Sequence, residues 1–95
     1  MRITDIIWKE RFVEKTAEKH GVSVAEVEEA LLSRPVVRKM AKGRVRGEDV
    51  YAALAQTSSG RYLIVFFINK KRGIALPISA RDMDPAERRY YATHR

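Results

Sequence analysis

The stretch RYLIVFFIN, residues 61–69, decides the fold of this chain. Apolar residues fill it without interruption from Tyr62 to Ile68, so both faces of an extended segment are apolar. β-Branched and aromatic residues favour strands, and a strand that is apolar on both faces belongs inside a sheet. We therefore expect residues 61–69 to form the central strand, with the other elements assembled around it.

Further strands are predicted on both sides of this segment. They are Ile3–Trp8, which is short and apolar, Val36–Ala41, Asp49–Gln56 and Ile74–Arg81, which alternates between two faces. Pro77 lacks the N–H group that a sheet ladder needs, and it therefore indicates an edge position or a bulge in the last of these strands.

Two helices are predicted between the first and second strands. Apolar residues at helical spacing indicate one helix over Lys9–His20, and Gly21 ends it because glycine adopts the left-handed conformation at low cost. Ser23 and Glu26 have the spacing of a capping box, which begins a second helix that runs to about Leu32.

A last helix is predicted to begin at Asp84 and Pro85, an N-cap residue followed by a proline in the first turn. The predicted order is β-α-α-β-β-β-β-α. It indicates an α+β fold in which an antiparallel sheet of four to five strands carries helices on one face. At 95 residues, we expect a single domain over residues 1–95.

Positive charge is the first clue to function. The chain has 19 Lys and Arg residues against 12 Asp and Glu residues, a formal net charge of +7. A run without any acidic residue holds Arg34, Arg38, Lys39, Lys42, Arg44 and Arg46. This uneven excess favours an anionic partner such as RNA or an acidic protein segment.

Composition also excludes several classes of protein. A chain that is 45% apolar is globular rather than disordered, and without cysteine it has no disulfide framework, thiolate nucleophile or cysteine-rich zinc site. The longest aliphatic and Phe run, residues 63–68, is too short to cross a bilayer, and the first ten residues do not resemble a signal peptide. We expect a cytoplasmic protein with no membrane contact.

Other catalytic motifs are not supported. Asp84 and Glu87 are explained as a capping pair, which leaves Asp82 alone as a magnesium ligand, so no metal site is expected. The glycines at 43 and 47 are not followed by the Lys-Ser/Thr of a phosphate-binding loop. Ser79 has neither a nearby histidine in the sequence nor the glycines of a nucleophile elbow. No cofactor is expected.

Several segments together resemble a known family. They are Lys19-His20-Gly21-Val22, Glu26-Val27-Glu28-Glu29, Gly47-Glu48-Asp49, Tyr51-Ala52-Ala53-Leu54, Gly60-Arg61-Tyr62-Leu63, Ile78-Ser79-Ala80-Arg81-Asp82-Met83 and Glu87-Arg88-Arg89-Tyr90. In this pattern, which spans about Trp8 to Tyr91, the chain resembles the BrnT toxins. The segment from Ile78 to Met83, with the Glu-Arg-Arg after it, is the most specific part.

The resemblance implies a fold like that of the RelE-type ribonuclease toxins. It further implies a metal-independent ribonuclease of a type II toxin–antitoxin pair, which inhibits translation and growth and is neutralised by a BrnA-type ribbon-helix-helix antitoxin. A dimeric state within the toxin–antitoxin complex is one arrangement that this implies. Two alternatives are a non-catalytic nucleic-acid- or partner-binding module of the same fold and a protein whose basic face only docks an acidic segment.

RNA cleavage without a metal requires a base, a donor for the leaving oxygen and cations for the pentacoordinate phosphate. Arg81, Arg61 and Arg88 are candidates for the cations, since guanidinium groups bind phosphate in a bidentate manner. Arg81 is favoured because it ends the polar face of the last predicted strand. The alternative for Arg81 is a salt bridge to an acid such as Asp49 or Glu87.

His20 and Glu48 are candidates for proton transfer. An imidazole exchanges protons in a suitable range, but a buried structural role at the end of the first predicted helix is the preferred interpretation of His20. Glu48 is a candidate base if an arginine lies beside it, although a charged residue that opens a strand is common. The residues expected to contact RNA through charge, hydroxyl groups or aromatic rings are Lys19, Arg72, Ser79, Arg88, Arg89 and Tyr91.

The charge excess generates a first prediction. RNA binding should weaken steeply with salt, and the slope of log K against log salt concentration should be about 0.7 for each phosphate neutralised on a single strand. Equilibrium binding of a single-stranded RNA between low and physiological salt measures this slope. An affinity that does not change over this range would contradict the electrostatic interpretation.

Overall fold

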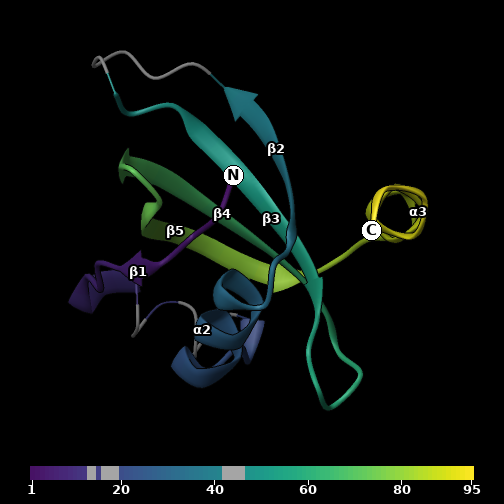
Figure 1. Ribbon diagram of the computed structural model, residues 1–95. Coiled ribbons are helices and arrows are strands. Elements are labelled where there is room, and N and C mark those ends of the chain that lie inside the picture. The colour runs from purple at the N-terminus through teal and green to yellow at the C-terminus, as the bar shows by residue number, and fades with distance from the viewer. Residues whose placement is uncertain (13–14, 16–19, 42–46) are drawn as a thin grey trace.

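The computed structural model of the chain describes residues 1–12, 15, 20–41 and 47–95 (Figure 1). Its elements are β1 (Asp5–Ile6), α2 (Val24–Leu32), β2 (Val36–Ala41), β3 (Val50–Gln56), β4 (Tyr62–Lys71), β5 (Ile74–Asp82) and α3 (Pro85–His94). Residues 10–12, 15 and 20 are also helical, in the position predicted for the first helix. Within these ranges no helix is long and apolar enough to span a bilayer.

The sheet has the strand order β1-β5-β4-β3-β2, and β4 is central as predicted. β2, β3, β4 and β5 pair antiparallel with one another, but β1 runs parallel to β5, so the sheet is mixed rather than purely antiparallel. Short connections force antiparallel pairing among β2 to β5, whereas the helical segments between β1 and β2 leave the direction of β1 free. β1 is also shorter than the predicted strand Ile3–Trp8.

One face of the sheet carries the main core. Leu63, Val65 and Phe67 of β4 point to this face and pack with Val27 and Leu31 of α2, all of them fully buried. Alternate residues of a strand point to opposite sides of a sheet, which explains why every second position of β4 belongs to this cluster.

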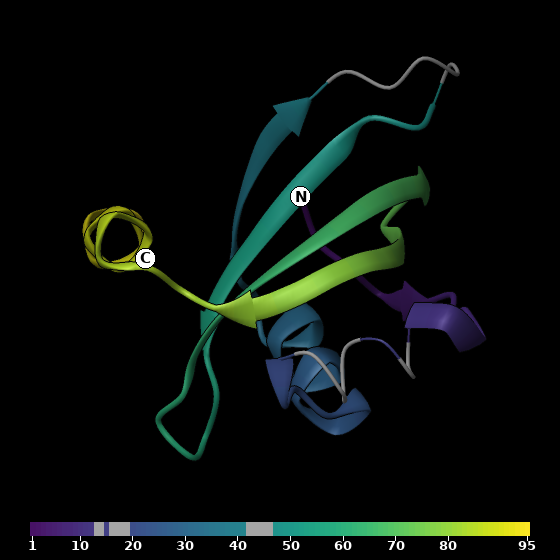
Figure 2. The same cartoon turned by 180° about the vertical axis from the view of Figure 1, so that it is seen from behind.

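The opposite face carries a smaller cluster and α3. Leu54 and Ile64 of the sheet pack with Met83, Tyr90 and Tyr91, whereas α3 itself contains no buried residue. The two helices therefore lie on different sides of the sheet (Figure 1; Figure 2). The sequence predicts helices on a single face. α2 lies on the face with the main core, but α3 lies on the opposite face, because the polar sequence of α3 does not indicate which face it contacts.

Pro77 and Gly73 shape β5 as their chemistry requires. The pairing of β4 with β5 shifts between Phe66 and Phe67, opposite Ser79 and Pro77, so the predicted bulge at Pro77 is confirmed. Gly73 has a φ of +88°, and an added Cβ atom there would collide with the backbone of the N-terminal segment. The Thr4 N–H donates to the Gly73 carbonyl at 3.0 Å, which aligns β1 with β5.

Both predicted capping boxes are present. The Ser23 hydroxyl accepts from the Glu26 N–H at 3.1 Å, and the Glu26 carboxylate accepts from the Ser23 N–H at 3.0 Å. At the start of α3, Asp84 and Glu87 make the same reciprocal pair, at 2.7 and 2.9 Å. These contacts satisfy N–H groups that a helix start leaves without partners.

Arg61, at the start of β4, joins three other segments through its guanidinium. Its Nε donates to Asp82 Oδ1 at 2.7 Å at the end of β5. Its Nη1 donates to the carboxylate of Glu26 in α2 at 3.1 and 3.2 Å and to the Gly21 carbonyl at 2.8 Å. Its Nη2 donates to the His20 carbonyl at 3.1 Å. We call these contacts the Arg61 network.

The Arg61 network makes stability depend on pH. Arg61 lowers the pKa of Asp82, and a backbone N–H of Ser23 together with Arg61 lowers the pKa of Glu26. Carboxyl groups whose pKa is lower in the folded state stabilise it fully above the unfolded pKa of about 4. That contribution is lost as the pH falls through the lower folded values.

The Arg61 network generates a second prediction. Arg61→Ala should lower the free energy of unfolding at pH 7 by about 1–3 kcal/mol, toward the lower figure because Asp82 is mostly exposed. Thermal unfolding measures this, at about 4–8 °C per kcal/mol for a domain of this size. The difference from the wild type should shrink below about pH 4.

Arg89→Ala is the matched control, because Arg89 is exposed on α3 and should change stability by less than about 0.5 kcal/mol. A melting temperature of Arg61→Ala equal to that of Arg89→Ala would show that the network does not stabilise the fold.

Candidate active site

Arg81 lies on the sheet face that carries α3. Its register partner is Ile64, which in turn pairs with Leu54, and both belong to the cluster on that face. Arg81 Nη1 and Nη2 donate to Glu87 Oε1 and Oε2 at 2.7 and 2.9 Å. The salt bridge to Glu87 expected as an alternative is thus confirmed. The Arg81 side chain stays 35% exposed, and a guanidinium binds phosphate with this same bidentate geometry.

Glu87 connects the start of α3 to the sheet. Its Oε1 accepts from Arg81 and from the Asp84 N–H, so one carboxylate both holds the arginine and caps the helix. The hydrogen bond from Arg81, and to a smaller extent the one from the Asp84 N–H, lowers the pKa of the Glu87 carboxyl group. The hydrogen bond to Glu87 in turn raises the pKa of Arg81. Glu87 is therefore a carboxylate at neutral pH, placed directly against the cation.

Tyr90, one turn further along α3, lies between two other side chains. The Arg38 Cζ atom of β2 lies 4.4 Å from the centre of the Tyr90 ring, and the His94 ring stacks on it with centroids 3.8 Å apart. Two groups at such distances occupy opposite faces of the ring. Arg38 reaches α3 because it pairs with Ala52, a residue of the same sheet face.

A second aromatic contact joins α3 to the start of β4. The Arg88 Cζ atom lies 4.1 Å from the centre of the Tyr62 ring, and Tyr91 meets Tyr62 edge to face at 6.1 Å. Arg95 lies over Tyr91 at 5.8 Å. Cation–π contacts of this kind, together with the Arg81–Glu87 pair, hold a helix that has no buried residue of its own.

The structure separates the other predicted catalytic residues from Arg81. Arg61 is engaged in the Arg61 network, whose partner Asp82 pairs with Leu63 and so belongs to the other face of the sheet. His20 is exposed, so a buried structural role for this residue is wrong; its carbonyl accepts from Arg61, and its side chain acts electrostatically on Asp82. Lys19 lies outside the described residues.

Glu48 and Arg72 lie near the opposite end of the sheet. Glu48 forms an ion pair with Lys70 at 2.9 Å, and Arg72 is exposed in the turn between β4 and β5. Arg81 lies level with Leu54 across the sheet, because both are in register with Ile64. Leu54 is four residues beyond the start of β3, which is about 13 Å along the strand at the usual rise per residue. Glu48 lies further away still, because it precedes that strand.

The remaining predicted RNA contacts lie closer to Arg81. Ser79 precedes Arg81 on β5 and pairs with Phe66, whose ring lies 5.5 Å below the Arg81 Cζ atom. Arg88, Arg89 and Tyr91 all belong to α3. Of the basic run after residue 34, Arg38 contacts Tyr90 and Lys39 forms a 2.9 Å ion pair with Asp49; positions 42, 44 and 46 lie outside the described ranges.

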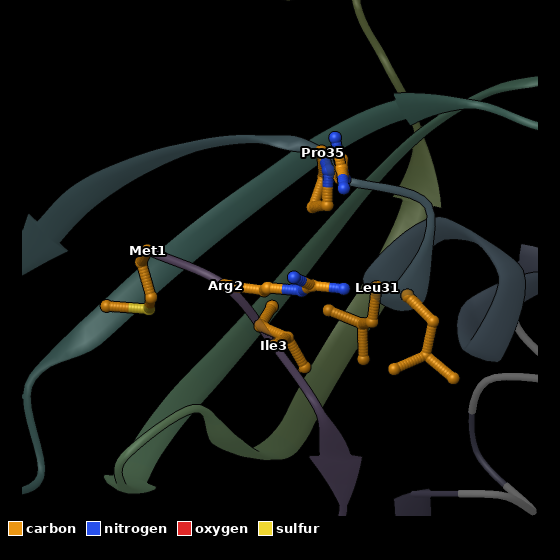
Figure 3. Close-up of a pocket in the computed structure, with 7 residues that line it drawn as sticks. Met1, Arg2, Ile3, Leu31 and Pro35 are labelled. Carbon is orange, nitrogen blue, oxygen red and sulfur yellow. The ribbon is translucent and has the colours of Figure 1, made fainter.

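Two cavities differ in their relation to Arg81. One of about 350 Å³ lies between the N-terminal segment and the end of α2, where Arg2 extends toward Leu31 and lies near Ile3 (Figure 3). None of the described residues that line it is acidic. The other, of about 250 Å³, lies between the sheet and α3, and Glu87 and Tyr90 line it.

In the described part of the chain, no three His, Asp or Glu residues gather as a metal site.

The family model described as the ribonuclease toxin BrnT of type II toxin–antitoxin systems matches residues 8–87. The chain belongs to the BrnT family. The resemblance found in the sequence is thereby confirmed, and it places the chain among ribonuclease toxins of type II systems, which act on RNA and are paired with an antitoxin. No curated protein sequence matches the chain. The BrnT match spans α2, β2 to β5, Arg81 and Glu87.

Two residues beside Arg81, Glu87 and Arg38, are not predicted as catalytic from the sequence. Glu87 was explained as a helix cap, and Arg38 only as one of several basic residues. The sequence does carry a signal for Glu87, which lies three residues after the capping Asp84 and six after Arg81. The sharp turn from strand to helix between them brings Glu87 and Arg81 together. The contact of Arg38 with Tyr90 depends on strand order, so no local signal identifies it.

Proposed function

We infer that the chain is an endoribonuclease that acts without a metal ion and uses Arg81 to hold the phosphate that is cleaved. The Arg81–Glu87 pair supports this most directly, because it holds a phosphate-binding guanidinium against a carboxylate on a partly exposed face. Family membership supports RNA as the substrate. Arg88, over Tyr62, and Arg38, over Tyr90, add positive charge on the same face of the sheet for the RNA backbone.

The reaction begins with an exchange of anions on Arg81. The RNA phosphate displaces the Glu87 carboxylate from the guanidinium, and Glu87 then loses the contact that lowers its pKa and becomes a stronger base. Glu87 takes the proton of the adjacent ribose 2′-hydroxyl. The 2′-oxygen bonds to phosphorus while the bond from phosphorus to the 5′-oxygen breaks.

The products are a 2′,3′-cyclic phosphate and a 5′-hydroxyl, whose proton comes from solvent, and the proton on Glu87 returns to solvent. Arg81 stabilises the additional negative charge on the pentacoordinate phosphate. His20 is assigned no step, since it acts on Asp82 on the other side of β5. The toxin would act in the cytoplasm, where cleavage of RNA stops translation and growth.

A non-catalytic binding module is the second candidate, and one observation favours it. Arg81 is already paired with Glu87, so the phosphate must compete with a bidentate partner. If the phosphate binds beside the pair without displacing Glu87, the protein binds RNA and does not cleave it.

Arg81 generates the third prediction. Arg81→Ala should reduce kcat for RNA cleavage by about 10²–10³, the loss expected for a group that stabilises charge in the transition state. Arg81→Lys should restore only part, since lysine lacks the planar fork of donors. Glu87→Gln should reduce kcat by about 10²–10⁴ as the loss of a general base. Cleavage of a labelled RNA under single-turnover conditions measures all three.

Two controls accompany these variants. The wild-type rate should be the same in EDTA, and a rate lost in EDTA and restored by a divalent cation would contradict a metal-independent mechanism. His20→Ala should cleave at the wild-type rate, and a large loss with an unchanged melting temperature would move the proton transfer to His20. Arg81→Ala that remains folded and cleaves like the wild type would favour the binding module.

We also propose the nature of the antitoxin contact. A BrnA-type ribbon-helix-helix antitoxin would cover the face between the sheet and α3 with an acidic or amphipathic segment. Charge complementarity supports this, because Arg38, Arg81 and Arg88 all lie on this face, with Arg95 beside them at the end of α3. Antitoxin and RNA would then compete for the same cations, within a complex that contains one or two copies of each chain.

Competition at this face is the fourth prediction. Saturation with antitoxin should abolish RNA binding, and Arg88→Glu should weaken the toxin–antitoxin complex by about tenfold and reduce its salt dependence. Arg2→Glu, in the cavity of Figure 3, is the matched control and should leave affinity unchanged. Binding titrations at two salt concentrations test this. A saturated complex that still cleaves RNA would contradict the proposed contact.

A further inference from the structure

The cavity between the sheet and α3 adjoins Arg81 without including it. Leu54 of β3 and Ile64 of β4, which are register partners, form its floor, and Met40 of β2 extends it. Ile64 is also the register partner of Arg81 on β5. Since neighbouring strands lie about 4.8 Å apart, the cavity begins one strand away from the guanidinium.

The cavity has the shape and chemistry of a nucleobase site. Its innermost residues, Leu54 and Ile64, are only 1% and 2% exposed, so the apolar surface open to a base comes from Met40, which is 46% exposed, and from the exposed Ala86. The cavity volume of about 250 Å³ is below the usual 300–1,000 Å³ for drug-sized ligands. This is room for one nucleoside rather than for two stacked bases. Arg38 and Tyr90 form a wall, and in this wall Arg38 lies over the Tyr90 ring.

That wall provides a stacking surface. His94 covers one face of Tyr90 and Arg38 the other, so the stack ends on the Arg38 guanidinium, which lines the cavity. Proteins that bind single-stranded RNA stack unpaired bases on aromatic rings and on arginine guanidinium planes. A base placed in the cavity against Met40 would extend this existing stack.

A carboxylate lies at the rim of the same cavity. Asp84 is exposed and lines the cavity, and its Oδ1 caps α3 by accepting from the Glu87 N–H. A carboxylate accepts a hydrogen bond from the exocyclic amino group of cytosine, whereas uracil presents a carbonyl oxygen at the same position. Asp84 at the rim would therefore attract the amino group of cytosine and repel the carbonyl oxygen of uracil.

We propose that this cavity binds the base on the 5′ side of the phosphate held by Arg81 and that it prefers cytosine to uracil. The base lies in the mouth of the cavity, against Met40 and beside Arg38, and its amino group donates to Asp84. Its ribose then presents the 2′-hydroxyl and the 3′-phosphate to the neighbouring strand, toward Glu87 and Arg81. The inference rests on the proposed function, because it assigns the phosphate to Arg81.

Binding of 3′-CMP and 3′-UMP to the intact chain, followed by NMR titration, tests this without requiring catalysis. We expect 3′-CMP to bind about tenfold more tightly than 3′-UMP, the factor for one hydrogen bond to a partly exposed carboxylate. Asp84→Asn should reduce this ratio toward one, while asparagine keeps the helix cap. Equal binding of the two nucleotides to the wild type would overturn the preference.

Ala86→Leu fills the cavity from α3 without touching the buried core, because Ala86 is exposed at its mouth. It should weaken 3′-CMP binding at least tenfold. Ala92→Leu is the matched control, since Ala92 is exposed on the same helix and does not line the cavity. Wild-type affinity in Ala86→Leu would overturn the assignment of the cavity, and a melting temperature for each variant confirms that it is folded.

The two proposals fail in different ways. A chain that binds 3′-CMP in this cavity but cleaves no RNA contradicts the proposed ribonuclease activity and leaves the base site standing. A chain that cleaves cytidine and uridine sites alike, and does so equally well with Ala86→Leu, contradicts the base site and leaves the ribonuclease activity standing.

Discussion

The guanidinium of Arg61 is the contact on which the placement of the site depends. It binds the carbonyls of His20 and Gly21, the carboxylate of Glu26 and that of Asp82. It thereby fixes the start of α2 against the end of β5, and the chain turns from that end into α3. Because Asp82 directly follows Arg81, the Arg61 network also fixes the backbone from which the Arg81 side chain, the proposed phosphate ligand, extends.

Because successive residues of a strand point to opposite faces of the sheet, the adjacent residues Arg81 and Asp82 have different roles. Asp82 shares the face of Leu63 and contributes to stability, whereas Arg81 shares the face of Ile64 and contributes to the site. The family match covers both residues. A shift of one residue in the pairing of β4 with β5 would exchange these tasks, so the bulge at Pro77, which sets the pairing, is part of the functional design.

Local chemistry explains what the sequence predicted correctly. The apolar run of β4, the two capping boxes and the bulge at Pro77 each depend on neighbouring residues, and each is present. The parallel direction of β1 and the face contacted by α3 depend on distant segments, for which no local pattern exists. The same limit applies to the site. The position of Arg81 on its strand predicts it as a candidate, but no local pattern shows that the strand register sets Glu48 far from it.

The outer edge of β2 has a consequence for association between copies of this chain. β2 pairs with β3 on one side and ends the sheet on the other, which leaves backbone donors and acceptors ready for another strand. Arg38 and Lys39 lie in this strand, and two such strands brought together would oppose cation to cation. The positive charge that we propose attracts RNA therefore also protects the free edge against aggregation, so a variant that neutralised it would lose both solubility and affinity for RNA.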